Sequence, residues 1–422
     1  MRARIAHIVP SDRIAYFLLR ARLAQVRDAG FEVSVICGRV AYGRELEESG
    51  LQVIHLPFAR EIAPITDVRC AWGLYHALRR GRFDIVHSHN PKGGLLGPFV
   101  GRLARSAALV HTVHGFLFNE NSTGLYRQLA LGVERWTAHW CDHLLFQSSE
   151  DYAYARSRRF KKPQQLHLIG NGIDQSRFDR DRYPQARRRK RAELGLEEQH
   201  LVVGMVGRLV REKGFGEFFA MASRISRALP QVRFLVVGIT EEDQSDRLDP
   251  HQLSAEYGIR DRCIILEQRR DMPELYLCMD AAVLPSYREG IPRALLEAAA
   301  MGVPIAASDI RGCREVIVDG ESGILFPLKD VDALTETVRL LLGDGDMRRR
   351  LGEAGRRRVL EHYTESGTAE RLIGFYHGIL EQRRLSVCKL ALTGGNGQSL
   401  VRENACSMES KSQVIDSGKM KL

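Results

Sequence analysis

The sequence lacks the features that mark disulfide-rich, zinc-binding or membrane-spanning proteins. Its eight cysteines are scattered and none stand as C-x-x-C, so we expect buried thiols rather than disulfides or structural zinc. It has no run of about 18 apolar residues, because arginines interrupt the longest candidate, residues 95–113. Polar residues from Ser11 onward end the first apolar stretch, which indicates a β-strand rather than a signal peptide. We therefore expect a cytoplasmic protein without a membrane span.

Two common nucleotide-binding motifs are also missing. Neither G-x-G-x-x-G nor G-x-x-x-x-G-K-[ST] occurs, so a dehydrogenase or a P-loop NTPase has no support. The net charge of +10 instead gathers in basic runs, at 156–162, 187–191, 348–350 and 356–358. Such runs attract anionic partners or form solvated helix faces. With only 7% aromatic residues, we expect some of these runs at an anionic membrane surface and expect no nucleic-acid partner.

Apolar strand patterns alternate with amphipathic helical patterns along two stretches, residues 1–175 and 200–365. Continuous apolar strands separated by helices indicate parallel sheets with helices on both faces. The prediction is two Rossmann-like domains, with a linker and a basic helix at 176–199 between them. A further helix is predicted at 366–385, followed by a disordered tail at 386–422.

One stretch, residues 283–302, combines a strand end, a tight turn and a helix with two glutamates. Glu289 lies in the predicted turn and Glu297 in the helix, about 12 Å apart if the separation were fully helical. Because such carboxylates cannot share a proton, we interpret them as two contacts to one elongated ligand. Amides at the start of a helix favour a phosphate or a polar sugar. The residues before this helix are Gly290, Ile291 and Pro292.

A second candidate segment opens the second half of the chain. Gly207 and Arg208 end a predicted strand, and Lys213 precedes the following helix. Arginine presents a planar fork to phosphate oxygens and lysine a compact charge. The pair can therefore neutralise a diphosphate without a metal ion.

Four histidines follow or end strands of the first half: His87, His89, His111 and His114. In parallel sheets the ligand crevice lies beyond the carboxyl ends of the strands. Histidines there can bind a metal or simply pack. Since no carboxylate spacing supports a metal cluster, we expect neither a metal nor a cofactor.

Together these segments resemble the retaining glycosyltransferases of family 4, which have the two-domain GT-B fold. Glu289 and Glu297 match the E-x7-E motif of that family, and the segment from Gly207 to Lys213 matches its diphosphate-binding segment. The resemblance covers about residues 1–385. It implies a cleft between two Rossmann-like domains and a final helix that crosses back to the first. It also implies that Glu289 faces the donor sugar, that Glu297 binds the nucleotide ribose and that His114 supports the reaction centre.

The first loop departs from the family pattern. Many members carry a Gly-Gly turn after the first strand, whereas this chain has PSDRIAYF at 10–17. The segments HSHNPKGGLLG and HTVHGFLFNE resemble the branch that builds capsule, O-antigen and exopolysaccharide. By this resemblance Gln268 and Arg269 lie at the nucleotide base. The acceptor-side candidates are Asp12, Arg13, Asn90, Lys92 and Gly115.

The resemblance implies a metal-independent bacterial enzyme that moves a hexosyl group from a nucleotide-diphosphate sugar with retained configuration. By family habit the donor is a UDP-sugar. The expected acceptor is a lipid-linked saccharide for surface polysaccharide, at the inner membrane face. Two alternatives stay open: a nucleotide-sugar epimerase of the same fold, and a non-catalytic basic protein that binds lipid or RNA.

Overall fold

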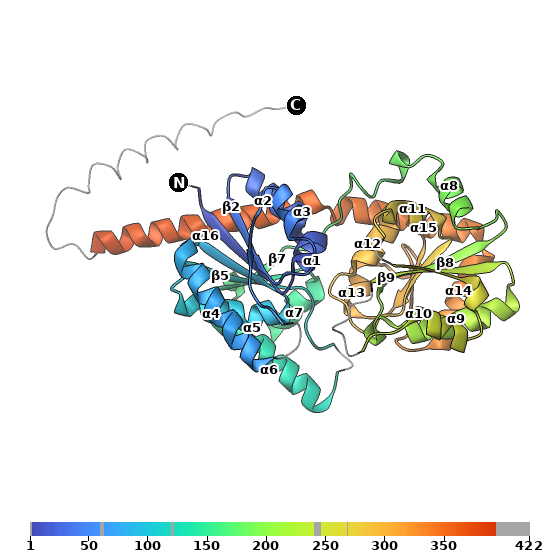
Figure 1. Cartoon of the computed structure of the whole chain (residues 1–422), viewed down its shortest axis with the longest axis horizontal. Helices are drawn as coiled ribbons and strands as arrows, with labels where there is room; N and C mark the ends of the chain where they lie inside the picture. Colours follow the sequence, from blue (N-terminus) through green and yellow to red (C-terminus); the bar gives the residue numbers. More distant parts are fainter. Residues whose placement is uncertain (1, 60–62, 120–121, 240–245, 268, 394–422) are drawn as a thin grey trace, which may run out of the picture. The chain divides into compact units, whose positions relative to one another are not determined.

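The computed structural model describes residues 2–59, 63–119, 122–239, 246–267 and 269–393, the last without side chains from 386 onward (Figure 1). Contacts divide the chain into two units, Met1–Ile373 and Gly374–Leu422. The first unit contains two separate parallel sheets, so the predicted pair of Rossmann-like folds is confirmed.

The first sheet has seven strands in the order β3-β2-β1-β4-β5-β6-β7, all parallel. Central strands such as β4 and β5 are buried along their whole length, as expected for a parallel sheet covered on both faces. Their buried residues include polar ones, namely His87, Ser88 and His89 in β4 and His111 and Thr112 in β5. The strands are β1 (Arg4–Val9), β2 (Glu32–Cys37), β3 (Gln52–His55), β4 (Ile85–His89), β5 (Ala108–Val113), β6 (His143–Phe146) and β7 (Leu166–Leu168).

Helices connect these strands. Apolar side chains of α4 and α5 pack with residues of β1, β2, β4 and β5 in one core. The elements are α1 (Asp12–Ile14), the π-helix η1 (Ala15–Leu19), α2 (Arg20–Asp28), α3 (Gly43–Glu48), α4 (Pro64–Gly81), α5 (Asn90–Leu103), α6 (Gly124–Trp140), α7 (Ser149–Ser157) and the 3-10 helix η2 (Pro163–Gln165).

The second sheet has six parallel strands in the order β10-β9-β8-β11-β12-β13. Its two faces carry separate cores, and in β8 Val202 points to one core and Val203 to the other, as strand alternation requires. The strands are β8 (Leu201–Arg208), β9 (Val232–Ile239), β10 (Cys263–Glu267), β11 (Ala281–Leu284), β12 (Ile305–Ser308) and β13 (Ile324–Phe326).

Helices α9 and α14 contribute to one of these cores, whereas α11 and α12 contribute to the other. The elements of this half are η3 (Arg180–Arg182), α8 (Ala186–Glu193), η4 (Arg211–Lys213), α9 (Phe215–Ala228), α10 (Pro250–Glu256), η5 (Arg260–Arg262), α11 (Met272–Cys278), α12 (Arg293–Ala300), α13 (Arg311–Val316), α14 (Val331–Gly343) and α15 (Gly345–His362).

The chain passes between the two halves twice, and the two crossings lie side by side. Ile173 forms a parallel bridge with Thr364, and its backbone N–H donates to the carbonyl of Tyr363 at 2.9 Å. A Cβ on Gly172 would lie 2.3 Å from the carbonyl oxygen of Thr364, so only glycine allows this approach. The two connections are therefore joined through their backbones.

The final helix, α16, covers Glu365–Thr393. Its beginning contacts the first half, because Arg22 Nε lies 2.9 Å from the Glu365 carboxylate and Arg371 Nε donates to the carbonyl of Ile169. The prediction of a tail from residue 386 was wrong at its start, since the helix continues to Thr393. The rest of that predicted tail, 394–422, lies outside the described residues.

Candidate active site

A cavity of about 450 Å³ lies between the two halves of the first unit, a volume typical of small-ligand sites. The first half contributes residues that follow its strands, and the second half contributes the ends of β8 and β11 and the start of α12. The polar lining residues are Arg13, Asn90, His114, Gln147, Asn171, Arg208, Lys213, Glu289 and Arg293.

Most of the predicted donor-side residues line this cavity. They are Gly207, Arg208, Lys213, Glu289, Gly290, Ile291 and Pro292. Lys213 Nζ lies 2.5 Å from Glu289 Oε1, with side chains 14% and 10% exposed. Pro292 is the N-cap of α12, so the positive end of this helix dipole is at the cavity. The second half thus presents cations and a helix N-terminus beside one carboxylate.

His114 faces them from the first half, at the end of a chain of imidazoles. His89 Nδ1 lies 3.1 Å from His114 Nε2, and His89 Nε2 lies 3.0 Å from His7 Nδ1. Burial, with a smaller contribution from the positive charge of Arg22, lowers the pKa of His114 to about 3. His114 is therefore a neutral imidazole near pH 7, and its tautomer depends on the hydrogen bond with His89.

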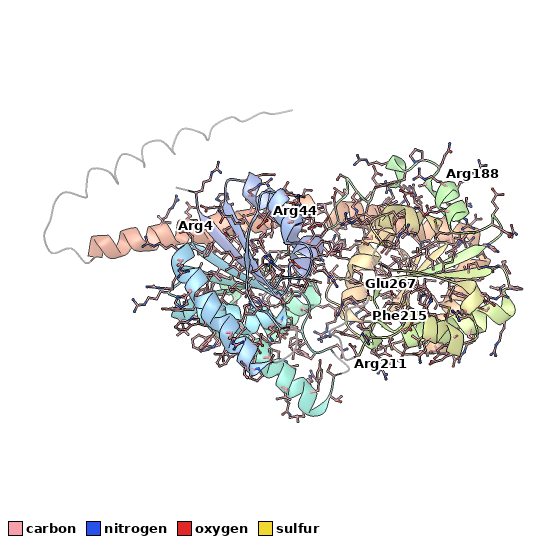
Figure 2. The ribbon with its side chains drawn as sticks, viewed as in Figure 1. Arg4, Arg44, Arg188, Arg211, Phe215 and Glu267 are labelled. Atoms are coloured by element: carbon pink, nitrogen blue, oxygen red, sulfur yellow. The ribbon has the colours of Figure 1, made fainter. Side chains whose placement is uncertain are left out.

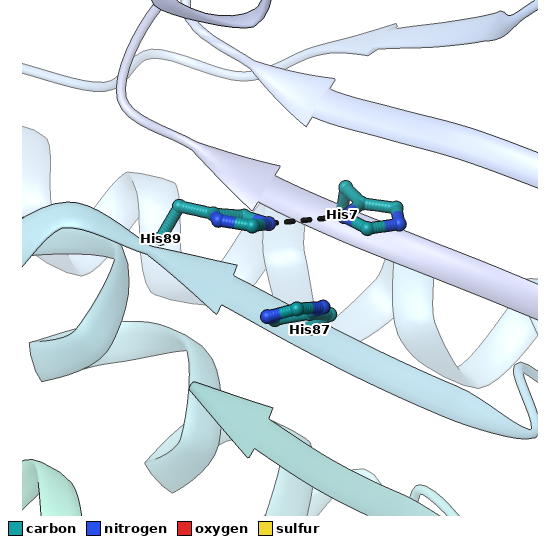
Figure 3. A group of neighbouring side chains, drawn as sticks. All are labelled: His7, His87 and His89. Atoms are coloured by element: carbon teal, nitrogen blue, oxygen red, sulfur yellow. Dashed lines mark hydrogen bonds between the residues drawn. The ribbon is translucent and has the colours of Figure 1, made fainter. Parts of the chain in front are cut away.

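Three of these imidazoles, His7, His87 and His89, offer nitrogen atoms within 4.8 Å of one another (Figure 3). The ring of His87 stacks on that of His89, with centroids 4.3 Å apart. Because ring nitrogen lone pairs lie in the ring plane, stacked rings do not direct them to a common point. His87 Nε2 also lies 2.7 Å from the Thr112 hydroxyl. The arrangement is that of packed, hydrogen-bonded neutral side chains.

The two halves come into close backbone contact at two glycines. A Cβ on Gly115 would lie 2.8 Å from Gly290 Cα, and one on Gly290 would lie 2.0 Å from the carbonyl oxygen of His114. Gly115 also has φ +110°, a conformation that other residues rarely adopt. This backbone contact sets the distance between His114 and Glu289.

A smaller cavity of about 220 Å³ adjoins this contact. Gly115, Asn90 and Lys213 line it together with an ion pair in which Arg288 Nε lies 2.7 Å from Glu212 Oε1. Asn90 has φ +61°. Among the described residues, its side-chain oxygen is buried without a hydrogen-bond partner. This arrangement leaves a hydrogen-bond acceptor available at the edge of both cavities.

Three candidates from the sequence bind partners within their own half of the molecule. Asp12 is fully buried and accepts backbone N–H groups of residues 40–42. Lys92 forms an ion pair with Asp67 at 2.7 Å. Arg269 binds Asp271 through Nε and Nη2 at 2.8 and 2.6 Å. None of the three lines either cavity, and Gln268 lies outside the described residues.

Glu297 lies behind the cavity wall rather than on it. Its carboxylate accepts the hydroxyl of Tyr276 at 3.1 Å and lies 3.9 Å from the Arg293 guanidinium. Burial raises the pKa of Glu297 above its usual value. Glu297 lines neither cavity in this conformation, so its predicted contact with the nucleotide ribose stays a prediction.

Gln147 and Asn171 line the cavity but were missed in the sequence. Gln147 follows β6 directly, and Asn171 follows β7 within the segment that crosses between the halves. The Asn171 side chain accepts Arg22 Nη2 at 3.1 Å. For Gln147 the usable signal was a polar residue directly after a mostly buried strand.

Ion pairs also join α13 of the second half to α7 of the first. Arg311 Nη1 lies 3.0 Å from Asp151 Oδ1, and Arg314 Nε lies 3.0 Å from Glu150 Oε1. Burial raises the pKa of Asp151 to about 6 despite the nearby Arg311. Burial also raises the pKa of Glu134 on α6 to about 7. Carboxyl groups at this boundary therefore titrate close to neutral pH.

The basic run at 187–191 forms α8 and binds its own half of the molecule. Arg187, Arg189 and Lys190 pair with Asp280, Glu274 and Asp271 at 2.7, 2.5 and 2.7 Å. Arg191 donates to the carbonyls of Cys278 and His200. Arg188 points outward from the same helix (Figure 2). Most of this run is therefore paired within its own half.

Comparison with known families agrees with this geometry. Residues 18–177 match the family described as Glycosyltransferase Family 4, and residues 186–358 match Glycosyl transferases group 1. The chain is a family 4 glycosyltransferase of the GT-B fold. It is an enzyme, as the sequence predicted.

Curated relatives of this glycosyltransferase act in bacteria. An Escherichia coli UDP-Gal:alpha-D-GlcNAc-diphosphoundecaprenol alpha-1,3-galactosyltransferase is 29% identical over 72% of this chain and 78% of the relative. The Staphylococcus aureus capsular polysaccharide biosynthesis glycosyltransferase CapM is 24% identical over 90% of this chain and 98% of the relative. The structure of Anabaena HepE in complex with UDP and glucose covers 89% of this chain and all of its own, with TM-score 0.74 and 18% identity.

Proposed function

We propose that this glycosyltransferase moves a hexosyl group from a UDP-sugar to a hydroxyl of a lipid-linked saccharide, with retained anomeric configuration. The relatives named above include a galactosyltransferase whose printed name gives a UDP-sugar donor and a diphosphoundecaprenol-linked acceptor. A role in capsule or related surface polysaccharide follows from the capsular relative. One observation carries the proposal: Arg208, Lys213, Glu289 and His114 converge on one cavity from both halves.

The donor diphosphate is proposed to bind at the end of β8 and the start of α12. Arg208 and Lys213 supply two positive charges there, and the α12 N-terminus adds its dipole. These groups compensate the charge that develops on the leaving diphosphate, where preorganised cations lower the barrier most. The proposal therefore includes no metal ion.

Retention is proposed to proceed on one face of the donor sugar. A double displacement needs two carboxyl groups about 5–5.5 Å apart, one as nucleophile and one as acid. Among the described residues that line the main cavity, Glu289 is the one carboxylate, and Lys213 pairs with it. We therefore assign the proton of the incoming hydroxyl to the leaving diphosphate oxygen. The bond from the anomeric carbon to that oxygen breaks as the bond to the acceptor oxygen forms.

Neutral His114 and the unpartnered oxygen of Asn90 are proposed to contact the sugars from the first half. A neutral imidazole can donate or accept a hydrogen bond without repelling a cationic sugar. Arg13 lies on the same side of the cavity and is a candidate for the acceptor phosphate. The lipid-linked acceptor places the enzyme at the inner face of a bacterial membrane.

The test is a transfer assay with a panel of UDP-, GDP- and ADP-sugars and a short-chain polyprenyl-diphosphate saccharide, with and without a chelator. We expect one UDP-sugar to raise the melting temperature of the enzyme. The same UDP-sugar should be transferred to the acceptor when the chelator is present. The product should keep the donor anomeric configuration by NMR. If no nucleotide sugar raises the melting temperature, the proposed function is contradicted. If the product has the inverted anomeric configuration, the proposed mechanism is contradicted. Interconversion of the donor sugar without acceptor would identify an epimerase.

A further inference from the structure

Helix α4 exposes a stripe of large apolar side chains. Ile65, Val68 and Trp72 are 74%, 71% and 67% exposed. Their spacing of three and four positions puts them on one side of the helix. The opposite side of α4, with Cys70, Leu74 and Leu78, is buried. Helix α4 is thus apolar on its outer side as well as its inner side.

Helix α6 repeats this pattern. Leu125, Leu129 and Trp136 are 71%, 62% and 44% exposed, and their spacing of four and seven positions again forms one stripe. Trp136 donates through Nε1 to the carbonyl of Leu95 on α5, which connects α6 to its neighbour. Helices α4, α5 and α6 lie side by side (Figure 1). We call the outer sides of these three helices the α4–α6 face.

The charge of this face is positive. The three helices contain two acidic residues: Asp67, which pairs with Lys92, and Glu134, which is buried. Their exposed charged side chains are all arginines, namely Arg69, Arg79, Arg80, Arg102 and Arg135. Arg102 pairs with Asp142, whereas the remaining exposed arginines add to an unbalanced positive charge.

Exposed tryptophan and aliphatic side chains beside arginines are the composition that binds a membrane interface. Anionic lipid attracts the arginines, and the apolar side chains enter the boundary between headgroups and acyl chains. A second copy of this chain fits less well, because a symmetric contact would place arginine against arginine without exposed carboxylates on these helices. The α4–α6 face therefore favours a lipid surface over self-association.

We propose that the α4–α6 face docks on the surface of an anionic membrane. This proposal rests on the proposed function in one respect: a lipid-linked acceptor is the reason for the enzyme to bind a membrane. Helix α5 begins at Asn90 in the cavity and ends at exposed Leu103, about 20 Å away along the helix axis. One layer of helices would thus bring the docked lipid surface and the sugar-binding cavity within reach of one lipid-linked acceptor.

The chain carries its own reporter for this surface. Its three tryptophans are Trp72, Trp136 and Trp140, on α4 and α6. The full-length protein is mixed with phosphatidylcholine vesicles, with or without phosphatidylglycerol and with brominated acyl chains. We expect a blue shift and bromine quenching of tryptophan fluorescence with phosphatidylglycerol, both weakened by salt. Unchanged fluorescence with these vesicles would overturn the proposal.

Paired substitutions distinguish vesicle binding by the α4–α6 face from nonspecific adsorption of the protein to vesicles. Val68→Glu with Leu129→Glu should weaken co-sedimentation with phosphatidylglycerol vesicles by about tenfold or more. The control Leu340→Glu changes a residue on α14 that is 48% exposed, and should bind as the parent protein does. Equal binding by all three proteins would refute the assignment. Conversion of a parent dimer to a monomer by the double substitution, without loss of vesicle binding, would assign the face to self-association.

Thermal shift with UDP-sugars distinguishes this proposal from the proposed function. The double variant should keep the parent's response to the donor, because neither residue lines either of the two cavities described above. Vesicle binding without any nucleotide-sugar response in the parent would leave the docking face established and the proposed function refuted. A donor response without vesicle binding would refute the docking face and leave the donor site of the proposed function supported.

Discussion

The ion pair between Lys213 and Glu289 allows the folding role of these residues to be separated from their role in donor binding. Nζ and Oε1 lie 2.5 Å apart, and both side chains are largely buried. Lys213→Met removes the cation and leaves the glutamate without its partner. Breaking a buried pair in this way costs about 3–5 kcal/mol. Since the cavity admits water on one side, we expect a loss of about 3 kcal/mol in unfolding free energy.

The double variant Lys213→Met with Glu289→Gln tests the origin of this loss. With both charges removed, we expect a stability within about 1 kcal/mol of the parent and a coupling energy of at least about 1.5 kcal/mol. Urea unfolding is followed by circular dichroism, which reports both halves. Tryptophan fluorescence reports the first half, where the tryptophans lie, and serves as an internal control because its transition should not move.

Donor binding should respond differently from stability. Both single variants and the double variant are expected to lose transfer activity, because each lacks a charge at the proposed diphosphate and sugar site. Recovered stability with absent activity in the double variant would separate the two roles. Additive single effects, with coupling near zero, would refute the argument that the two side chains form a dehydrated ion pair.

Three further substitutions test the surroundings of this pair. Gly115→Ala should lower kcat about a hundredfold, because the added Cβ would displace Gly290 and small displacements of reacting groups have effects of this size. The matched control is Gly216→Ala, where nothing lies within 4 Å of the added Cβ. His89→Phe keeps a ring but removes the hydrogen-bond partner of His114, so kcat should fall about fivefold to tenfold with little change in KM. Equal tautomer populations of His114 by NMR in the parent and the variant would contradict the role of His89 in setting that tautomer. Glu134→Gln should gain stability relative to the parent as pH rises from 4.5 to about 7. The parent carboxyl there keeps a proton that the unfolded chain has lost, and the advantage should reach roughly 3 kcal/mol above pH 7; a pH-independent difference in urea midpoints would show that the carboxyl titrates normally.

The fold could be predicted because its strands are buried on both faces. Strands such as β11 and β12 are almost continuous apolar runs, and a parallel sheet with helices on both sides buries them completely. Residues that line the cavity because they follow a strand or precede a helix, such as Arg208 and Glu289, were predictable for the same local reason. Gly115 makes a close backbone contact with Gly290 and also lines the smaller cavity, so its predicted contact with the acceptor stays a prediction.

Residues that bind partners far away in the sequence were not predictable. Asp12 begins α1 where a loop was expected, and its carboxylate accepts backbone N–H groups of residues 40–42. Arg187, Arg189 and Lys190 of α8 pair with carboxylates that are more than 80 residues further along the chain. The apolar stripes of α4 and α6 have helical spacing, which usually indicates a core. Only the three-dimensional structure shows which side of each helix is exposed.

The bridge between Ile173 and Thr364 constrains how the enzyme can open. Two separate connections would allow the halves to slide, twist and bend independently. Joined at one point through their backbones, with Gly172 against Thr364, they act mechanically as one strap. Sliding would require breaking the hydrogen bonds on both sides of Ile173, whereas bending about the strap would not. Side-chain substitutions beside Ile173 and Thr364 would leave this pivot in place, because its contacts are made by main-chain atoms.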